Sequence, residues 1–363
     1  MKVLFITAGD ERLGSSRIRV YQYLPYLDQA GIKSTVVPLT GWLTGSFQRL
    51  PRRIEGLLSF FERRLSDIRF WFVVKQAGEF DLVFLQKALM PLWAQKQLVA
   101  KQKPVIIDLV DAIFHSHQLN PRNFEWVRKW ALQVRWKRLR FALIHSRCVI
   151  LDNPVNQQIV QKYNKNIVLI AGPIDTRRYS PRPNERDDGK VVIGWIGNPL
   201  NTTYIRPLYG VFQRLAQAYP QVVFEFIGAQ PFTLPGVELR FMQWDLDTEV
   251  ENLHRFDIGI MPVPDDKWSR GKGGYKLLQY MALGIPSVAS PVGINSELLS
   301  QGETGFLVST EEEWFQKLNE LIVTAQLRQS MGQKARNLVA SRYSFQVAAP
   351  RLITALRAAA REK

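Results

Sequence analysis

The chain contains almost no cysteine and little histidine. Cys148 is the single cysteine among 363 residues, which excludes an intramolecular disulfide and a cysteine-rich zinc site. The four histidines leave little material for a histidine-ligated metal. We therefore expect neither a bound metal nor a cofactor.

Long apolar segments are absent as well. No run of about 18 uncharged apolar residues occurs, so the sequence predicts no membrane-spanning helix. Only four apolar residues follow Met1 and Lys2, which is too few for a signal peptide. These absences favour a cytoplasmic protein.

Several common signatures of catalysis and cofactor binding are also missing. The chain has no G-x-G-x-x-G after its first expected strand, no P-loop, no H-E-x-x-H and no G-x-S-x-G. Asp245-Leu-Asp247 has the D-x-D spacing of some metal-dependent sugar transferases. Such a short pattern is frequent by chance, and we interpret it as a surface loop.

Positive charge, by contrast, is abundant and unevenly distributed. Of the net charge of +16, residues 1–180 carry +15, from 28 basic and 13 acidic residues. The hydrophobic content of 46% is globular, and the length suffices for two domains. The asymmetry indicates that one half meets an anionic surface, either a membrane leaflet or nucleic acid.

Short apolar runs alternate with helical patterns in both halves, which predicts mostly parallel sheets with helices on both faces. Strands are expected at 2–7, 34–39, 81–85, 104–109, 148–151, 167–170, 191–196, 222–227, 256–261, 287–290 and 305–308. Helices are expected at 17–30, 91–103, 205–219, 275–283, 310–325 and 345–361. A stretch rich in proline and glycine at 172–190 is the best candidate linker.

In two basic stretches, 49–78 and 123–147, large aromatic and aliphatic side chains alternate with arginines and lysines. This composition suits a helix at a membrane headgroup interface. The alternative is a pair of amphipathic helices that cover the sheet with solvated basic faces. No RNA- or DNA-reading motif accompanies the charge, so nucleic acid is the less favoured partner.

Residues 271–293 are the most informative stretch. A glycine-rich turn with two lysines, Gly271-Lys-Gly-Gly274, leads into an apolar helix that stops at Gly284. Backbone N–H groups at a helix start, together with lysines, form an anion site, and phosphate is the expected anion. The alternative is an ordinary helix cap with solvated lysines.

This stretch resembles the donor-site signature of family-4 (group 1) retaining glycosyltransferases with the GT-B fold. In that signature a glutamate is followed, after seven residues, by Glu-Ala-Met-Ala-x-Gly-x-Pro, a strand and a glycine turn. Here Met281-Ala-Leu-Gly-Ile-Pro286 matches closely, and Ser290-Pro-Val-Gly293 and Thr304-Gly-Phe306 continue the pattern. The segment Ser15–Pro25 is similar to a polysaccharide-biosynthesis subgroup.

The resemblance implies an α/β fold of two Rossmann-like domains that face each other across a cleft. We expect these domains at 1–175 and 176–344, with a C-terminal helix at 345–363 crossing back to the first. The implied activity is transfer of a hexosyl group from a nucleotide-diphosphate sugar to an acceptor hydroxyl, with retention and without a metal. The basic first domain suggests a saccharide or lipid-linked acceptor at an anionic membrane, as in surface-polysaccharide or glycolipid assembly.

Two glutamates of the signature are replaced here. Gly271 stands where the family holds the donor sugar, and Gln279 where it holds the ribose. Gln279 can still hydrogen-bond a ribose diol, whereas Gly271 has no side chain. Lys272 and Lys276 are additional charges that we expect near the donor diphosphate, with Lys272 as a candidate catalytic residue.

Further donor-binding candidates come from turns in both halves. In the family, the loop after the first strand lies near the donor phosphates, and the first turn of the second domain approaches the diphosphate. The corresponding candidates are Gly14, Ser15, Ser16, Arg17, Gly197, Asn198, Arg206, Gly273, Gly274 and Tyr275. For either serine, an ordinary N-cap is an equally good interpretation.

Asp111 is the candidate for the acceptor side. Many relatives carry a histidine after the strand that corresponds to 104–109, and this chain has Asp111 there. A carboxylate at the carboxyl end of a strand is well placed to contact an acceptor hydroxyl, although it could equally cap the next helix. His115 and His117 are interpreted as loop surface.

Three other functions remain open from the sequence. A sugar-nucleotide epimerase shares the fold, a non-catalytic nucleotide- or sugar-binding protein would explain the missing glutamates, and a nucleic-acid-binding module would explain the charge. We favour the glycosyltransferase, cytoplasmic or peripheral at the inner face of the membrane.

Overall fold

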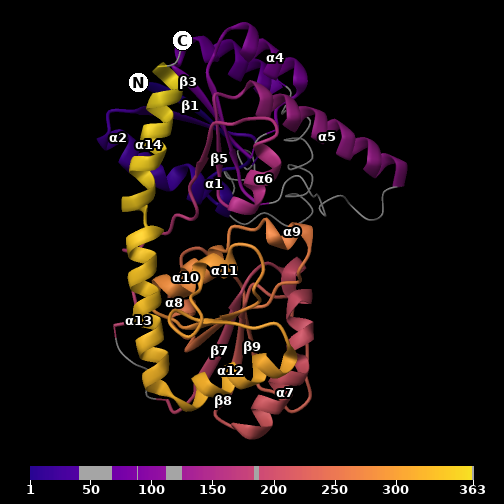
Figure 1. Cartoon of the computed structure of the whole chain (residues 1–363), viewed down its shortest axis with the longest axis vertical. Coiled ribbons are helices and arrows are strands. Elements are labelled where there is room, and N and C mark those ends of the chain that lie inside the picture. Colours follow the sequence, from indigo (N-terminus) through magenta and orange to yellow (C-terminus); the bar gives the residue numbers. More distant parts are fainter. Residues whose placement is uncertain (41–67, 88, 112–124, 184–187, 362–363) are drawn as a thin grey trace. The chain divides into compact units, whose positions relative to one another are not determined.

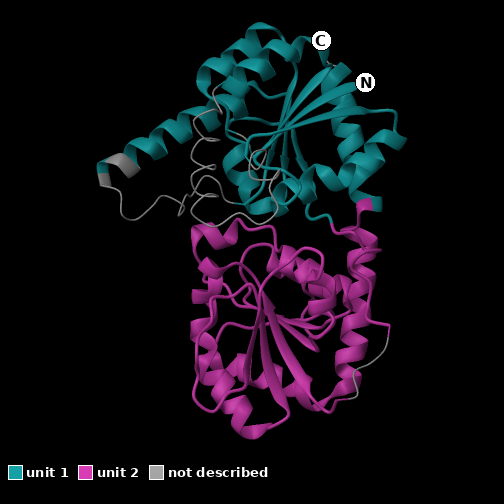
Figure 2. Ribbon diagram, turned by 180° about the vertical axis from the view of Figure 1, so that it is seen from behind, with its two compact units in different colours: residues 1–173, 346–363 teal, residues 174–345 magenta. Residues whose placement is uncertain are grey.

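A computed structural model describes residues 1–40, 68–87, 89–111, 125–183 and 188–361 (Figure 1). Residues 49–67 of the first basic stretch, and both His115 and His117, lie outside this part of the chain. The described residues divide into two compact units, 1–173 with 346–363 and 174–345 (Figure 2). All of the C-terminal helix α14 (Phe345–Arg361) except its first residue belongs to unit 1, the first of these units.

Unit 1 is built on a six-stranded parallel sheet in the order β2-β1-β3-β4-β5-β6. The central strands are completely buried because helices cover both faces. The strands are β1 (Lys2–Thr7), β2 (Lys33–Pro38), β3 (Leu82–Gln86), β4 (Val105–Leu109), β5 (Cys148–Leu151) and β6 (Ile167–Leu169). The helices are α1 (Gly14–Arg19), α2 (Leu24–Gln29), α4 (Leu92–Ala100), α5 (Glu125–His145), α6 (Gln157–Val160) and α14, with helical residues also at 68–76.

Unit 2, residues 174–345, contains a second six-stranded parallel sheet, in the order β12-β11-β10-β7-β8-β9. The strands are β7 (Val191–Ile196), β8 (Val222–Ile227), β9 (Leu239–Met242), β10 (Ile258–Met261), β11 (Ser287–Ala289) and β12 (Phe306–Leu307). The helices are η5 (Pro199–Leu208), α7 (Tyr209–Ala218), α8 (Glu249–Leu253), α9 (Lys267–Arg270), α10 (Tyr275–Ala282), α11 (Asn295–Leu298), α12 (Glu311–Val323) and α13 (Ala325–Arg342). Two parallel-sheet α/β units of Rossmann type are thus confirmed.

A fully buried ion pair joins α1 to β4 in unit 1 and also contacts the segment that follows β6. The Arg19 guanidinium donates to both carboxylate oxygens of Asp108, and its Nη1 donates to the carbonyls of Ile170 and Gly172. Arginine is suited to this position because its planar fork satisfies several acceptors at once. Arg19 therefore has a structural role in unit 1.

Two expected helices are interrupted, each at a proline. The helix expected at 17–30 is divided into α1 and α2, with Pro25 in the first turn of α2. The helix expected at 205–219 begins as the 3₁₀ helix η5, and the α-helix starts only after Pro207. In both places proline lacks the N–H that an uninterrupted α-helix requires.

Several elements were not expected from the sequence: the short helices α6, α8, α9 and α11, the long helix α13 and the strand β9. Helix α13 is mostly polar and buries a narrow stripe formed by Met331, Ala335 and Val339. Strand β9 is an edge strand whose residues are all partly exposed, so it lacks an alternating pattern.

Candidate functional site

The sheet of unit 2 has a switch point between β7 and β10. The chain proceeds from β7 outward through β8 and β9, and then returns to the other side of β7 with β10, β11 and β12. Ligands of open α/β sheets bind outside the carboxyl ends of the strands at such a point. The carboxyl end of β7 carries Gly197 and Asn198, two of the predicted residues.

Only glycine fits at position 197, because a side chain there would clash with neighbouring groups. A Cβ at this position would lie 2.2 Å from the Trp195 ring, which is fully buried. The Gly197 carbonyl in turn lies where a Cβ of Gly228 would be, at 2.3 Å, and Gly228 has a positive φ of 73°. The turns after β7 and β8 are therefore packed backbone against backbone.

The turn before α10 is shaped by Gly274. This residue is the N-cap of α10 and has a left-handed backbone with φ 64°. A Cβ there would lie 2.6 Å from Leu298 and 2.8 Å from Ile294, so only glycine fits. The start of the eight-residue helix α10, at Tyr275, presents backbone N–H groups as the sequence predicted.

Two lysines lie over aromatic rings at this turn. The Lys272 ammonium lies 4.3 Å from the centre of the Tyr204 ring and donates to the Tyr204 hydroxyl at 3.3 Å. The Lys276 ammonium lies 4.4 Å from the centre of the Trp195 ring. Both contacts have cation–π geometry.

Lys276 has an unusually low pKa. Burial removes its ammonium from water, and the positive charge of Lys272 acts in the same direction, so the pKa of Lys276 falls to about 7. In the part of the chain that the structure describes, no acidic group offsets these two effects. Two nearby positive charges, one with a lowered pKa, favour the binding of an anion between or beside them.

The side chain of Gln279, which we expected to bind the ribose, is almost completely buried. Its side chain is only 4% exposed, and its amide donates to the Tyr179 hydroxyl at 3.3 Å. The Tyr179 hydroxyl also hydrogen-bonds the buried Glu249, whose other oxygen accepts from Trp244 Nε1. Gln279 thus belongs to a buried polar network under α10, and its ribose contact stays a prediction.

The segment after β7 contributes Tyr204 in place of Arg206. Asn198 caps η5 by accepting from the backbone N–H of Asn201 at 3.1 Å. Arg206 is exposed on η5, and Tyr204, two residues earlier, contacts Lys272. The sequence analysis did not consider Tyr204 because an isolated tyrosine in a turn gives no signal of its own.

In unit 1, the loop after β1 is held by a buried serine. Ser16 is fully buried, accepts from the Gly9 backbone N–H at 3.1 Å and donates to the Gln86 side chain at 3.0 Å. Leu13 is the N-cap of α1, and Gly14 is its first residue. Ser15 and Ser16 therefore lie inside the helix, and the alternative that they act as N-caps is wrong.

Arg17 is directed toward the same loop. Its guanidinium donates to the carbonyls of Glu11 and Arg12, at 3.3 Å and 3.4 Å, and the side chain is largely buried. Donor binding by the segment Gly14–Arg17 stays a prediction.

Asp111 forms part of a charged group at the carboxyl ends of three strands. Its carboxylate pairs with Lys87, which follows β3, at 3.0 Å. Its backbone N–H donates to the Asp152 carboxylate, which follows β5, at 3.4 Å. Lys87 and Asp111 both have left-handed backbones, with φ of 53° and 63°. Such conformations cost free energy and cluster at functional sites.

Asp152 is the most perturbed member of this group. It is buried, and its Oδ1 has no hydrogen-bond partner. Burial first, and the negative charge of Asp111 second, raise the pKa of Asp152 to about 7. The sequence analysis missed Lys87 and Asp152, although both follow an expected strand as Asp111 does.

Metal ligation is not supported in the part of the chain that the structure describes. No group of three or more histidine, cysteine, aspartate or glutamate residues is found there that could hold a metal ion. Asp245 and Asp247 are both in this part, and the Asp245 carboxylate accepts from the Asp247 backbone N–H at 2.8 Å. The D-x-D spacing thus forms a local turn.

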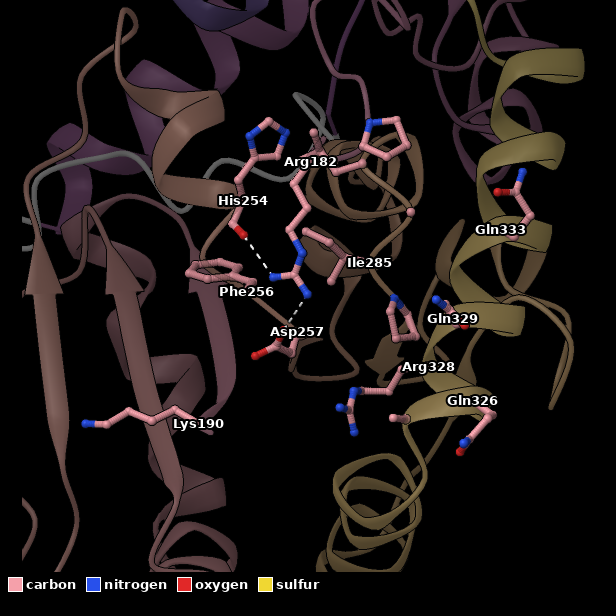
Figure 3. Close-up of a pocket in the computed structure, with 15 residues that line it drawn as sticks. Arg182, Lys190, His254, Phe256, Asp257, Ile285, Gln326, Arg328, Gln329 and Gln333 are labelled. Carbon is pink, nitrogen blue, oxygen red and sulfur yellow. Dashed lines mark hydrogen bonds and ion pairs between the residues drawn. The ribbon is translucent and has the colours of Figure 1, made fainter. Parts of the chain in front are cut away.

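A separate polar pocket of about 430 Å³ lies near the amino ends of β7, β10 and β11 (Figure 3). The Arg182 guanidinium pairs with Asp257 at 2.9 Å and donates to the His254 carbonyl at 3.3 Å. These amino ends are opposite to the ends that carry the candidate donor residues. The pocket is therefore distinct from the predicted site.

Comparisons with known proteins bear on the family and on the fold. Residues 190–323 match the family model of glycosyl transferases group 1. Spore coat protein SA of Bacillus subtilis (strain 168) is 22% identical over 242 residues, which are 58% of this chain. The chain spans 64% of the length of that curated relative.

Solved structures match over nearly the whole chain. HepE of Anabaena, crystallised with UDP, superposes with a TM-score of 0.68 at 17% identity, covering 99% of this chain and 100% of HepE. Sucrose-phosphate synthase of Thermosynechococcus elongatus superposes with a TM-score of 0.67 at 15% identity, covering 99% and 98% of the two chains. The resemblance found in the sequence is confirmed: residues 190–323 match the family model of glycosyl transferases group 1, and the chain as a whole has the GT-B fold.

Proposed function

We propose that this protein is a retaining glycosyltransferase that needs no metal. It transfers a hexosyl group from a nucleotide-diphosphate sugar to an acceptor hydroxyl, in the assembly of a cell-surface polysaccharide or glycolipid. The donor diphosphate binds at the switch point of unit 2, and unit 1 binds the acceptor.

The pair Lys272 and Lys276 is the observation that carries this proposal. Both ammonium groups are held over aromatic rings at the start of α10, and the pKa of Lys276 is lowered to about 7 with no acid to offset the shift. A diphosphate supplies the missing negative charge and accepts hydrogen bonds from both lysines.

The chemistry needs charge stabilisation more than it needs a nucleophile. As the bond from the sugar to the diphosphate breaks, negative charge grows on the leaving oxygen and positive charge on the sugar ring. Lys272, Lys276 and the N–H groups at the start of α10 are preorganised for the first of these charges. Lys272 acts as the catalytic member of the pair. It follows Gly271, which stands where the family glutamate holds the donor sugar.

Uridine is the first base to test, since HepE was crystallised with UDP and with UDP-glucose. The buried network of Gln279 and Tyr179 supplies polar atoms beside the donor site for a ribose. The replacement of the first family glutamate by Gly271 leaves the identity of the sugar to other groups.

On the acceptor side, Asp111 orients the hydroxyl that attacks the sugar. Its carboxylate keeps one strong partner, Lys87, at 3.0 Å and is itself about one-third exposed, so a substrate hydroxyl can reach it. In a retaining transfer without a protein nucleophile, the departing diphosphate accepts the acceptor proton, and Asp111 holds the geometry.

A second candidate is a non-catalytic GT-B protein that binds a nucleotide or sugar. The observation that favours it is the loss of both family glutamates, at Gly271 and Gln279. Turnover separates the candidates, because a binding protein releases no nucleotide from any sugar donor.

A thermal-shift screen with UDP, GDP, ADP and TDP tests the donor site. A ligand at a hundredfold excess over its Kd stabilises a protein by about 2.7 kcal/mol, a shift of several degrees. We expect UDP to give this shift, and the double variant Lys272→Ala, Lys276→Ala to lose it. The control Lys267→Ala, on the exposed face of α9, retains it. If no nucleotide stabilises the wild-type protein, the proposal is wrong.

A further inference from the structure

Unit 1 contains a hollow of about 630 Å³ whose lining includes Ser15, a donor-binding candidate, but no residue of the 271–293 stretch. Ala8 and Lys87, which follow β1 and β3, lie on one side of it, and α5 forms the other side. This volume is in the range of sites for molecules of ligand size.

Among the residues that the structure describes, the lining combines apolar and cationic side chains and includes no acid. Leu13, Leu89, Trp130 and Val134 supply the apolar part. Lys87, Arg135 and Arg138 supply the cationic part. A ligand that matches both parts is an anion with an apolar group attached.

The contribution of α5 follows from its helical spacing. Trp130, Val134 and Arg138 recur every four residues and share one face of the helix, and Arg135 lies at the edge of this face, toward the buried Leu139. Another face, with Leu139 and Leu143, is buried in the core of unit 1. The face toward the hollow therefore carries large side chains that the core does not use.

Arg135 is the sharpest indication of a missing anion. Its Nε is buried and has no hydrogen-bond partner among the residues that the structure describes. Burial alone lowers the pKa of Arg135, and no carboxylate opposes this effect. A guanidinium that is partly desolvated without a counter-charge is costly unless a ligand pairs with it.

Trp130 completes the apolar side. Its side chain is 62% exposed although it lines the hollow. An exposed tryptophan beside arginines gives a flat surface for an alkyl or prenyl chain, while the arginines bind the headgroup.

We propose that this hollow binds an amphiphilic phosphate, with the phosphate on Arg135 and Arg138 and the apolar chain on Leu13, Leu89 and Trp130. Within the proposed function, on which this inference rests, this ligand is the acceptor or the carrier to which the acceptor saccharide is attached. Lys87 both lines the hollow and pairs with Asp111 at 3.0 Å, so the bound phosphate lies close to the residue that orients the hydroxyl.

Calorimetric titration with monomeric dodecyl phosphate, below its critical micelle concentration, tests the inference. We expect binding with one ligand per chain that is at least about tenfold tighter than binding of inorganic phosphate, glucose 6-phosphate or dodecyl maltoside. Arg135→Gln and Trp130→Ala should each weaken the binding of dodecyl phosphate by about tenfold or more. The first removes a charged contact with the phosphate, and the second removes an apolar contact with the alkyl chain.

Two variants on the same helix serve as matched controls. Lys137→Gln removes an exposed charge and Trp126→Ala removes a tryptophan that is 70% exposed, and neither residue lines the hollow. Both should bind dodecyl phosphate as the wild-type protein does.

Three results would overturn the inference. Equal affinity for glucose 6-phosphate or inorganic phosphate assigns the hollow to a soluble phosphate, and equal affinity for dodecyl maltoside removes the role of the phosphate. An unchanged affinity in Arg135→Gln removes the role of the guanidinium. The UDP thermal shift, measured on the same samples, is independent of these results. A protein that UDP stabilises but that does not bind dodecyl phosphate refutes this inference and leaves the donor site intact.

Discussion

At the scale of single residues, the proposed donor site contains a lysine whose charge is unfavourable in the free protein. The Lys276 ammonium lies over the Trp195 ring, which favours it, and close enough to Lys272 for the two charges to interact. Burial and the repulsion from Lys272 both oppose the ammonium form and lower its pKa. The arrangement has a clear benefit only when an anion binds.

The lowered pKa of Lys276 makes nucleotide binding dependent on pH. Below pH 7 the free protein already carries the ammonium, whereas above pH 7 binding of a diphosphate must include uptake of a proton. We expect the affinity for UDP to fall above pH 7 by up to about tenfold per pH unit. The second ionisation of a phosphate is near 6, so it does not contribute in this range. Titration calorimetry at pH 7, 8 and 9 measures the effect.

Lys276→Met should abolish this pH dependence, while the exposed Lys267→Met should leave it unchanged. The same variant should stabilise the free protein. The cost of the buried ammonium is fully present below pH 7 and disappears as the pH rises toward about 10.4, the pKa of lysine in an unfolded chain. A steep pH dependence that persists in Lys276→Met would contradict this account.

At the scale of elements, the start of α10 depends on one glycine. Gly274 needs a left-handed backbone and also has no space for a Cβ, since Leu298 and Ile294 lie within 2.8 Å of that position. Gly302 has a similar φ of 75° but nothing within 4 Å of a Cβ. The two glycines therefore separate the cost of backbone strain from the cost of a clash.

Substitution of these glycines by alanine gives a measurable difference. Gly302→Ala should lower the free energy of unfolding by about 1–2 kcal/mol through backbone strain alone. Gly274→Ala should lose a further ~1–3 kcal/mol through overpacking, and it should weaken UDP binding because it shifts the start of α10. Denaturant unfolding and the UDP thermal shift measure the two effects. Equal stabilities of the two variants would show that the clash is relieved without cost.

The sequence was informative about elements wherever the information is local. The glycine-rich turn and the apolar helix after it were placed correctly because glycine, lysine and the helical pattern act within a few residues. The interruptions at Pro25 and Pro207 were missed because an apolar pattern can continue across a change of helix type. Helix α13 was missed because its buried stripe is narrow and its other faces are polar.

At the scale of the whole molecule, the positive charge of residues 1–180 coincides with exposed apolar side chains in unit 1. Trp71 and Phe72 are each half exposed on the helical residues 68–76, and Trp126 is exposed on α5. The opposite face of the 68–76 helix is buried, with Val73 and Val74 in the core. None of the helices that the structure describes is long and apolar enough to cross a bilayer.

These features predict reversible binding of unit 1 to anionic membranes. We expect the protein to sediment with vesicles that contain phosphatidylserine, and to be released as salt rises from 0.1 M to 1 M, where the screening length shortens from about 10 Å to about 3 Å. The double variant Trp71→Ala, Phe72→Ala should bind more weakly. Leu200→Ala, which removes a residue of unit 2 that is 86% exposed, is the control. Binding that is equally strong to neutral vesicles would argue against the electrostatic contribution.

The sequence by itself determined the α/β class and the glycosyltransferase resemblance, because each depends on patterns of neighbouring residues. It also identified Lys272, Lys276 and Asp111 as candidates. Only the tertiary structure decided which side chains meet them. Within unit 2 the lysines meet Tyr204 and Trp195, and within unit 1 Asp111 meets Lys87 and Asp152, all from other segments of the chain. The lowered pKa of Lys276 and the buried, unsatisfied Nε of Arg135, as seen among the described residues, also depend on the tertiary structure, because burial is a property of packing and no short pattern encodes it.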